Sequence, residues 1–235
     1  MNMISILLLK DFKTSFKNLF VFSSVITVPI LGFIFSLNPG MDPQQLAGMF
    51  AVLIVLNIYV AGANTTACLI AEEKEMKTLN TLKLANIKPT QIMISKIVSS
   101  GTILLVTSMI SYFIMSGYVI MSIPMFLVIA IIHCAIALTI GFIIGIATKS
   151  QIIASSLAAA VGFFMLLITD IVYVIPLPDI AWEIVIRTAP FVVIRLLTTP
   201  GVYFPFAEDL LYSLLGLVVV FVVALVVYKK RSGLQ

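Results

Sequence analysis

Charged residues are scarce in this chain. Only 10% of its 235 residues are charged, 61% are hydrophobic, and the mean hydropathy is +1.20. Soluble globular domains carry a charge on about a quarter of their residues, so this composition excludes a soluble enzyme or binding domain. The net charge of +4 comes from basic residues that are spread along the chain. They form no single patch, and we expect no nucleic-acid partner.

Cysteine and histidine are also rare. Cys68 and Cys134 both fall in apolar runs, so they indicate no disulfide framework, and we expect each to be a small packing residue. His133 is the only histidine, and a lone imidazole lacks the further ligands of a metal site and a recognisable nucleophile partner. The apolar runs contain no paired His, Asp or Glu, which argues against an intramembrane enzyme.

A phosphate-binding loop is missing as well. The pattern G-x-x-x-x-G-K-[ST] does not occur, and the nearest run, Gly141 to Ser150, has the wrong spacing. We therefore expect no ATP hydrolysis, catalytic residue or cofactor in this chain itself. Gly141 and Gly145 instead form a small-x-x-x-small face, which is typical of closely packed helices in membranes.

Long uncharged runs predict an all-α integral membrane protein with a single domain over residues 1–235. A spanning helix needs about 20 mostly apolar residues. Residues 1–18 place apolar side chains at four-residue steps, with lysines mostly on the other side, which predicts a helix in the membrane interface and not a cleaved signal. The six expected spans are 19–37, 46–70, 97–120, 124–147, 152–172 and 210–228.

The basic residues predict the orientation. Twelve of the 14 lysines and arginines fall in one set of loops, together with both termini and the segment 71–96. The other set contains only Arg187 and Arg195, in the proline-rich segment 173–209. The positive-inside rule therefore places both termini in the cytoplasm and segment 173–209 outside.

The segment 71–96 holds eight of the 24 charged residues. Within it, Met76, Leu79, Leu82 and Ala85 recur every three residues, which predicts an amphipathic cytoplasmic helix in the region 71–90. Such a helix is either a solvated loop that keeps the topology or a docking helix whose apolar face enters a groove on a partner. The pattern alone does not decide between the two.

Polar residues within the expected spans give a second set of candidates. Asn57 and Asn64 make the second span polar on part of its surface, and His133 lies near the middle of the fourth. Buried polar groups in membranes are functional candidates by default, so these three residues could line a substrate path. The Asn side chains could equally join helices, and a neutral His133 bonded to a neighbouring helix is the simpler interpretation.

The charged segment contains a motif that is made of Glu73, Lys74, Glu75, Thr78, Leu79, Leu82, Leu84, Pro89, Ser95 and Lys96. With this motif it resembles the insert after the second span of type-2 ABC transporter permeases. That family pattern reads EKExGTLexLlxxPxxxxxxxxGK. Lys77 and Ser95 stand where the family has glycine. The resemblance extends to an N-terminal interface helix, six spans and an apolar outer segment before the last span.

The resemblance implies a permease subunit of an ATP-driven exporter in a bacterial plasma membrane. Two ABC nucleotide-binding subunits would hold ATP and Mg, and a second permease, identical or related, would complete the assembly. The cargo would be a drug, an antimicrobial peptide or a lipid-like molecule. Residues 1–18 would be an elbow helix, 71–90 a coupling helix, and 173–209 short re-entrant helices. The expected contacts with the ATPase subunit are Glu72, Glu73, Lys74, Glu75, Thr78, Leu79, Leu82 and Leu84.

The alternative function is a membrane carrier, sensor or immunity protein that works without an ATPase. Secondary carriers usually place ionisable residues near the midplane for ion coupling. His133 is the only such residue expected in these spans, which weakens this alternative.

Overall fold

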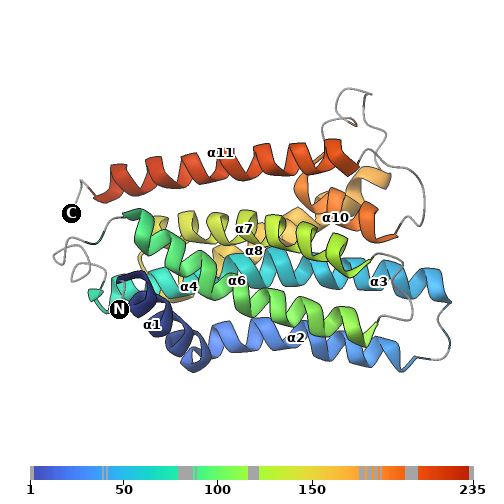
Figure 1. Ribbon diagram of the computed structural model, residues 1–235, viewed down its shortest axis with the longest axis horizontal. Helices are drawn as coiled ribbons and strands as arrows, with labels where there is room; N and C mark the ends of the chain where they lie inside the picture. Colours follow the sequence, from blue (N-terminus) through green and yellow to red (C-terminus); the bar gives the residue numbers. More distant parts are fainter. Residues whose placement is uncertain are drawn as a thin grey trace.

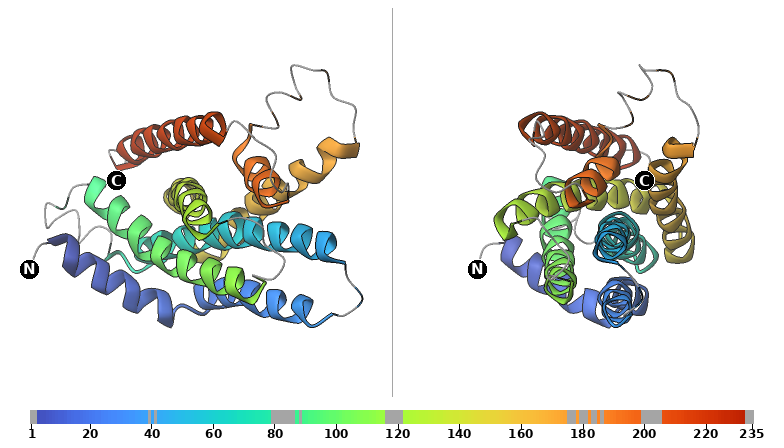
Figure 2. Two further views of the ribbon diagram at one scale, coloured as in Figure 1. Left: turned by 45° about the vertical axis from the view of Figure 1, so that its right-hand side comes forward. Right: turned by 90° about the vertical axis from the view of Figure 1, so that its right-hand side faces the viewer.

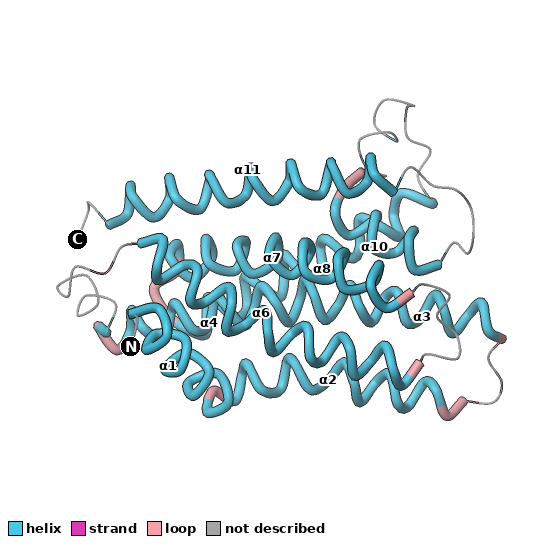
Figure 3. Tube along the Cα trace, in the orientation of Figure 1, coloured by secondary structure: helices cyan, strands magenta, loops and turns pink. Residues whose placement is uncertain are grey.

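The protein is a bundle of long helices (Figures 1 and 3), known from a computed structural model. The structure describes residues 3–38, 40, 42–78, 87, 89–115, 122–174, 178, 182, 185, 187–198 and 206–232, and these residues contain no β-strand. The all-α class is therefore confirmed. The elements are α1 (Met3–Lys17), α2 (Leu19–Ser36), α3 (Pro43–Val55), the π-helix η1 (Leu56–Ala61), α4 (Gly62–Glu75), α6 (Pro89–Ile114), α7 (Ile123–Ala147), α8 (Gln151–Val174), α10 (Ala189–Thr198) and α11 (Phe206–Ser232).

Within the described residues, five helical stretches are long and apolar enough to cross a membrane. A sixth is obtained if α1 and α2, which meet at a bend of 68°, count as one broken span. The chain is therefore compatible with a multi-pass membrane protein; its orientation stays a prediction. The five stretches are Pro43–Glu75, Thr90–Ile114, Ile123–Ala147, Gln151–Ile168 and Glu208–Lys230.

The stretch α3–η1–α4 is continuous and lies inside the bundle (Figure 2). In its most apolar 18 residues, 72% of the residues are buried inside the protein, whereas the share is 11% for the corresponding 18 residues of α11. It begins with a capping box, in which the Asp42 carboxylate accepts the backbone N–H groups of Gln44 and Gln45 and the Gln45 side chain accepts the N–H of Asp42. It ends at Glu75, five residues beyond the expected end of the second span, and Lys77 follows with a φ of 57°.

Close backbone contacts hold α7 against this central stretch. A Cβ atom built on Gly141 would lie 2.2 Å from the carbonyl oxygen of Ala63, and one on Gly145 would lie 2.9 Å from that of Ala67. No side chain fits at such distances, so the expected packing role of the two glycines is confirmed. Gly162 brings α8 equally close to η1, with its built Cβ atom 2.7 Å from the Cα of Val60.

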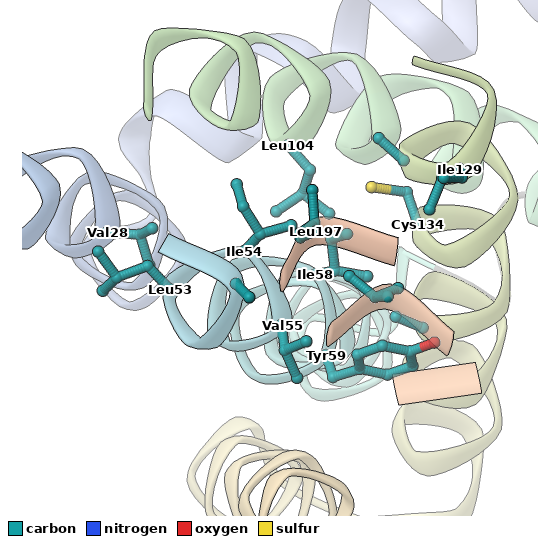
Figure 4. Close-up of a cluster of buried hydrophobic side chains, with 14 of the residues drawn as sticks. Val28, Leu53, Ile54, Val55, Ile58, Tyr59, Leu104, Ile129, Cys134 and Leu197 are labelled. Atoms are coloured by element: carbon teal, nitrogen blue, oxygen red, sulfur yellow. The ribbon is translucent and has the colours of Figure 1, made fainter. Parts of the chain in front are cut away.

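The largest apolar cluster lies where α2, α3, η1, α6, α7 and α10 meet (Figure 4). Cys134 is part of it and Cys68 is buried elsewhere against Val21 and Leu69, so both cysteines pack as expected. Both carry free thiols.

Two expected elements remain open. Of the helix predicted for 71–90, residues 79–86 and 88 lie outside the described residues, while residues 71–75 belong to α4, which ends before the turn at Met76 and Lys77. The segment 173–209, which is predicted to lie outside, contains α10 among its described residues, and the re-entrant character of the segment stays a prediction.

Candidate functional site

The last turn of α4 joins several other helices at one end of the bundle. We call its residues Glu72–Glu75 the α4 tetrad. Glu72 accepts a hydrogen bond from the side-chain amide of Asn18, between α1 and α2, with an N–O distance of 2.7 Å. Glu73 Oε1 accepts one from Lys10 on α1 and one, at 2.9 Å, from Lys96 on α6. The tetrad therefore connects both helices of the N-terminal pair to α6.

The interactions of Lys96 complete a buried ionic cluster. Its Nζ atom lies 2.6 Å from Asp11 Oδ1, and Ser95 Oγ donates to the other Asp11 oxygen at 3.0 Å. The side chains of Lys96 and Asp11 are each 2% exposed, and that of Glu73 is 7% exposed. Together with Lys10 the cluster contains two cations and two anions, so its formal charge is zero. A buried ion is stable only when it is paired in this way.

The other two residues of the tetrad bind helix ends. The Nζ atom of Lys74 donates to backbone carbonyls at the C-terminal end of α7, where unpaired carbonyls and the helix dipole favour a cation. The carboxylate of Glu75 accepts the backbone N–H of Gln151 at 2.9 Å, at the N-terminal end of α8, where an anion is favoured. The carbonyls that Lys74 reaches are those of Gly145, Ile146 and Thr148.

The pairing of Glu73 with Lys96 brings the two ends of the segment 76–88 close together. Glu73 precedes the segment 76–88 and Lys96 follows it, and they pair directly across its base. Because Lys96 also pairs with Asp11, α1, α4 and α6 are joined at this point. Lys74 and Glu75 join the ends of α7 and α8 to the same turn of α4.

The expected ATPase contacts fall into two groups. Glu73 is buried and bonded within the chain, whereas Glu75 and Thr78 are exposed. Thr78 Oγ1 donates to the Glu73 carbonyl at 3.2 Å. Leu79, Leu82 and Leu84 lie outside the described residues. Contact with an ATPase subunit stays a prediction for all eight residues, and the exposed ones are its best probes.

Sequence reasoning did not identify Asp11 as a partner. In α1, Leu7, Asp11 and Ser15 follow at four-residue steps and are buried, while Phe16 is 65% exposed. The protein-facing side of this helix thus carries Leu7, Asp11 and Ser15, whereas Phe16 faces outward. The four-residue spacing of Asp11 between Leu7 and Ser15 is the only local signal for it.

The polar candidates inside the bundle are not brought into one site. Asn57 Nδ2 donates to Ser108 Oγ at 2.7 Å, on α6. Asn64 accepts a bond from Cys68 of its own helix. His133 Nδ1 lies 2.8 Å from Tyr59 Oη. The prediction that His133 bonds a neighbouring helix is confirmed, and the substrate path stays a prediction.

A small cavity adjoins His133. Its volume is about 10 Å³, room for about one water, and its polar lining comes from His133, Ser213 and Asp209. The His133 Nε2 atom is 3.5 Å from Ser213 Oγ, and Asp209 is paired with Arg195 of α10. No group of three or more His, Cys, Asp or Glu side chains that could hold a metal occurs in the described part of the chain.

Comparisons with known proteins give no identification: no family model and no curated protein matches this chain.

Proposed function

We propose that this protein is the transmembrane permease subunit of an ATP-driven exporter of the type-2 ABC kind. The observation that carries the proposal is the buried ionic cluster that joins the two ends of segment 76–88 to α1. A segment that only connects two spans has no need of a buried Asp11–Lys96–Glu73 cluster at its base, with the half-exposed Lys10 completing its charge balance. A segment on which a partner pushes needs a rigid attachment to the helices that it moves.

The conformation of Lys77 also supports the resemblance. Lys77 stands where the family motif has glycine, and its φ of 57° lies in the left-handed region that glycine adopts without strain. Lys77 therefore has the backbone conformation expected of the glycine in the family motif, although its residue type differs.

In this proposal the ATPase is a separate chain, present in two copies that hold ATP and Mg, and a second permease completes the transporter. The ATPase contacts the exposed residues at and after Glu75. Their movement reaches α1 and α6 through the ionic cluster, and α7 and α8 through Lys74 and Glu75. The central stretch α3–η1–α4 carries it into the bundle. The cargo is a hydrophobic or amphipathic molecule.

Charge reversal at the exposed position tests the coupling. We expect Glu75→Lys to reduce ATP-dependent transport in proteoliposomes that contain the complete transporter, with unchanged expression. Glu208→Lys is the matched control, because Glu208 is an exposed glutamate at the start of α11, at the opposite end of the bundle. Transport by Glu75→Lys at the level of Glu208→Lys would contradict the assignment of this surface. Failure to find any partner chain with a phosphate-binding loop would contradict the proposed function itself.

A proton-coupled carrier is the second candidate. The observation in its favour is that Tyr59, His133 and Ser213 form a buried polar chain next to a cavity that Asp209 also lines. Ionisable groups in such a position are typical of proton pathways. Transport driven by a proton gradient without ATP, and abolished by His133→Phe, would favour the carrier over the exporter.

A further inference from the structure

A lateral groove lies between α1, α2 and α6, and no residue of the α4 tetrad lines it. Its volume is about 400 Å³, and the described residues that line it are three from α1, five from α2 and five from α6. Ser15, Thr102 and Thr107 are the polar ones. Each of their hydroxyl groups donates to a carbonyl of its own helix, at 2.9, 2.8 and 3.0 Å respectively. The groove therefore presents a surface suited to hydrocarbon.

The length of the groove matches one leaflet of a bilayer. Along α2 it runs from Val21 to Pro29, and along α6 from Thr102 to Ile110. Each stretch rises by about 12 Å at 1.5 Å per residue. Half of the hydrocarbon core is about 15 Å thick. A single acyl chain that enters beside α1 would thus fill the groove over its length.

Basic residues stand at the α1 end of this groove. Phe12 and Phe16 line it, and Lys13 and Lys17, each the next residue along the chain, are exposed. Successive residues are about 100° apart around a helix, so α1 presents an aromatic side and a basic side next to each other. This arrangement is typical of helices at the surface of anionic membranes, where each lysine favours an anionic headgroup.

We propose that the groove binds one acyl chain of an anionic phospholipid, whose phosphate lies beside Lys13 and Lys17. The site belongs to the leaflet on the side of α1, and it does not depend on the proposed ATPase coupling. A lipid fits better than a second copy of the chain. In a two-fold contact through this face the lysines of both α1 helices would approach each other, and their like charges would repel.

Native mass spectrometry of the purified full-length chain tests the site. The probes are dioleoyl phosphatidylglycerol and dioleoyl phosphatidylethanolamine, which carry the same acyl chains on different headgroups. We expect one phosphatidylglycerol to bind with a preference of about 25-fold, since each lysine near an anionic surface contributes about fivefold. K13Q/K17Q should abolish the preference, and K13R/K17R should keep it.

A second pair of variants tests the groove. Val106 lines it and is 53% exposed. Val106→Trp should therefore obstruct the groove and lower the binding of both lipids at least about tenfold, which corresponds to about 1.4 kcal/mol. Val219→Trp is the control, at a 61% exposed position on α11. Equal binding of the two lipids, a preference that survives K13Q/K17Q, or full lipid binding by Val106→Trp would overturn the proposal. Conversion of a dimer to a monomer by Val106→Trp with lipid binding unchanged would overturn it in favour of an interface between copies.

Discussion

Replacing Lys96 with methionine tests the ionic cluster most directly. The change keeps an unbranched side chain that is one atom shorter, and it removes the cation that lies 2.6 Å from Asp11 and 2.9 Å from Glu73. Glu73 retains Lys10 as a partner, whereas Asp11 is left with only the hydroxyl of Ser95 among the contacts described for it. An uncompensated carboxylate would then remain buried between α1 and α6.

The expected loss follows from this burial. Removing one partner of a buried ion pair costs about 3–5 kcal/mol. For a chain of this length that corresponds to a melting temperature lower by about 6–20 °C. We would measure it by thermal unfolding of the purified protein in detergent. The matched control is Lys13→Met on the exposed face of α1, which should cost less than about 0.5 kcal/mol.

A second substitution separates charge from packing. Asp11→Asn removes the stranded charge, so we expect Lys96→Met/Asp11→Asn to recover part of the lost stability, with a coupling energy of up to about 3 kcal/mol. If Lys96→Met melts within about 2 °C of the wild type, the cluster does not stabilise this end of the bundle. If the double variant is no more stable than Lys96→Met, the loss comes from packing and the argument from charge is refuted.

Three further predictions concern the bundle itself. Gly141→Ala should destabilise the protein by about 1–3 kcal/mol in the same unfolding assay, because its Cβ atom would meet the backbone of the neighbouring helix. The control is Gly48→Ala, where nothing lies within 4 Å, and it should be neutral or stabilising by up to about 1 kcal/mol. Equal effects of the two variants would contradict the packing argument. Asp42→Ala removes the capping box and should cost about 1 kcal/mol, with Asp42→Asn retaining most of the stability. His133→Phe leaves the hydroxyl of Tyr59 without its partner and should cost about 1–3 kcal/mol, and adding Tyr59→Phe should recover much of it; no recovery would show that this hydrogen bond is not the cause.

The sequence by itself determined the class of the protein. Within a membrane, an uncharged run of about 20 residues must satisfy its own backbone hydrogen bonds, because the lipid supplies no partners. A single run of this kind can do so only as a helix. The spacing of Gly141 and Gly145 likewise predicted a close helix contact, because no other residue type lets two backbones approach so closely. These features depend on neighbours in the chain, and local rules suffice for them.

Only the tertiary structure decided which charges meet. Lys96 and Asp11 are 85 residues apart, and nothing in the local pattern of either one selects the other. The motif indicated that Glu73 matters and suggested that it contacts a partner protein; the fold buries it against Lys10 and Lys96. It also placed Asp11 of α1 against the protein and left Phe16 of the same helix exposed. Buried charges must find partners wherever packing brings them together, so this choice follows from the arrangement of the helices.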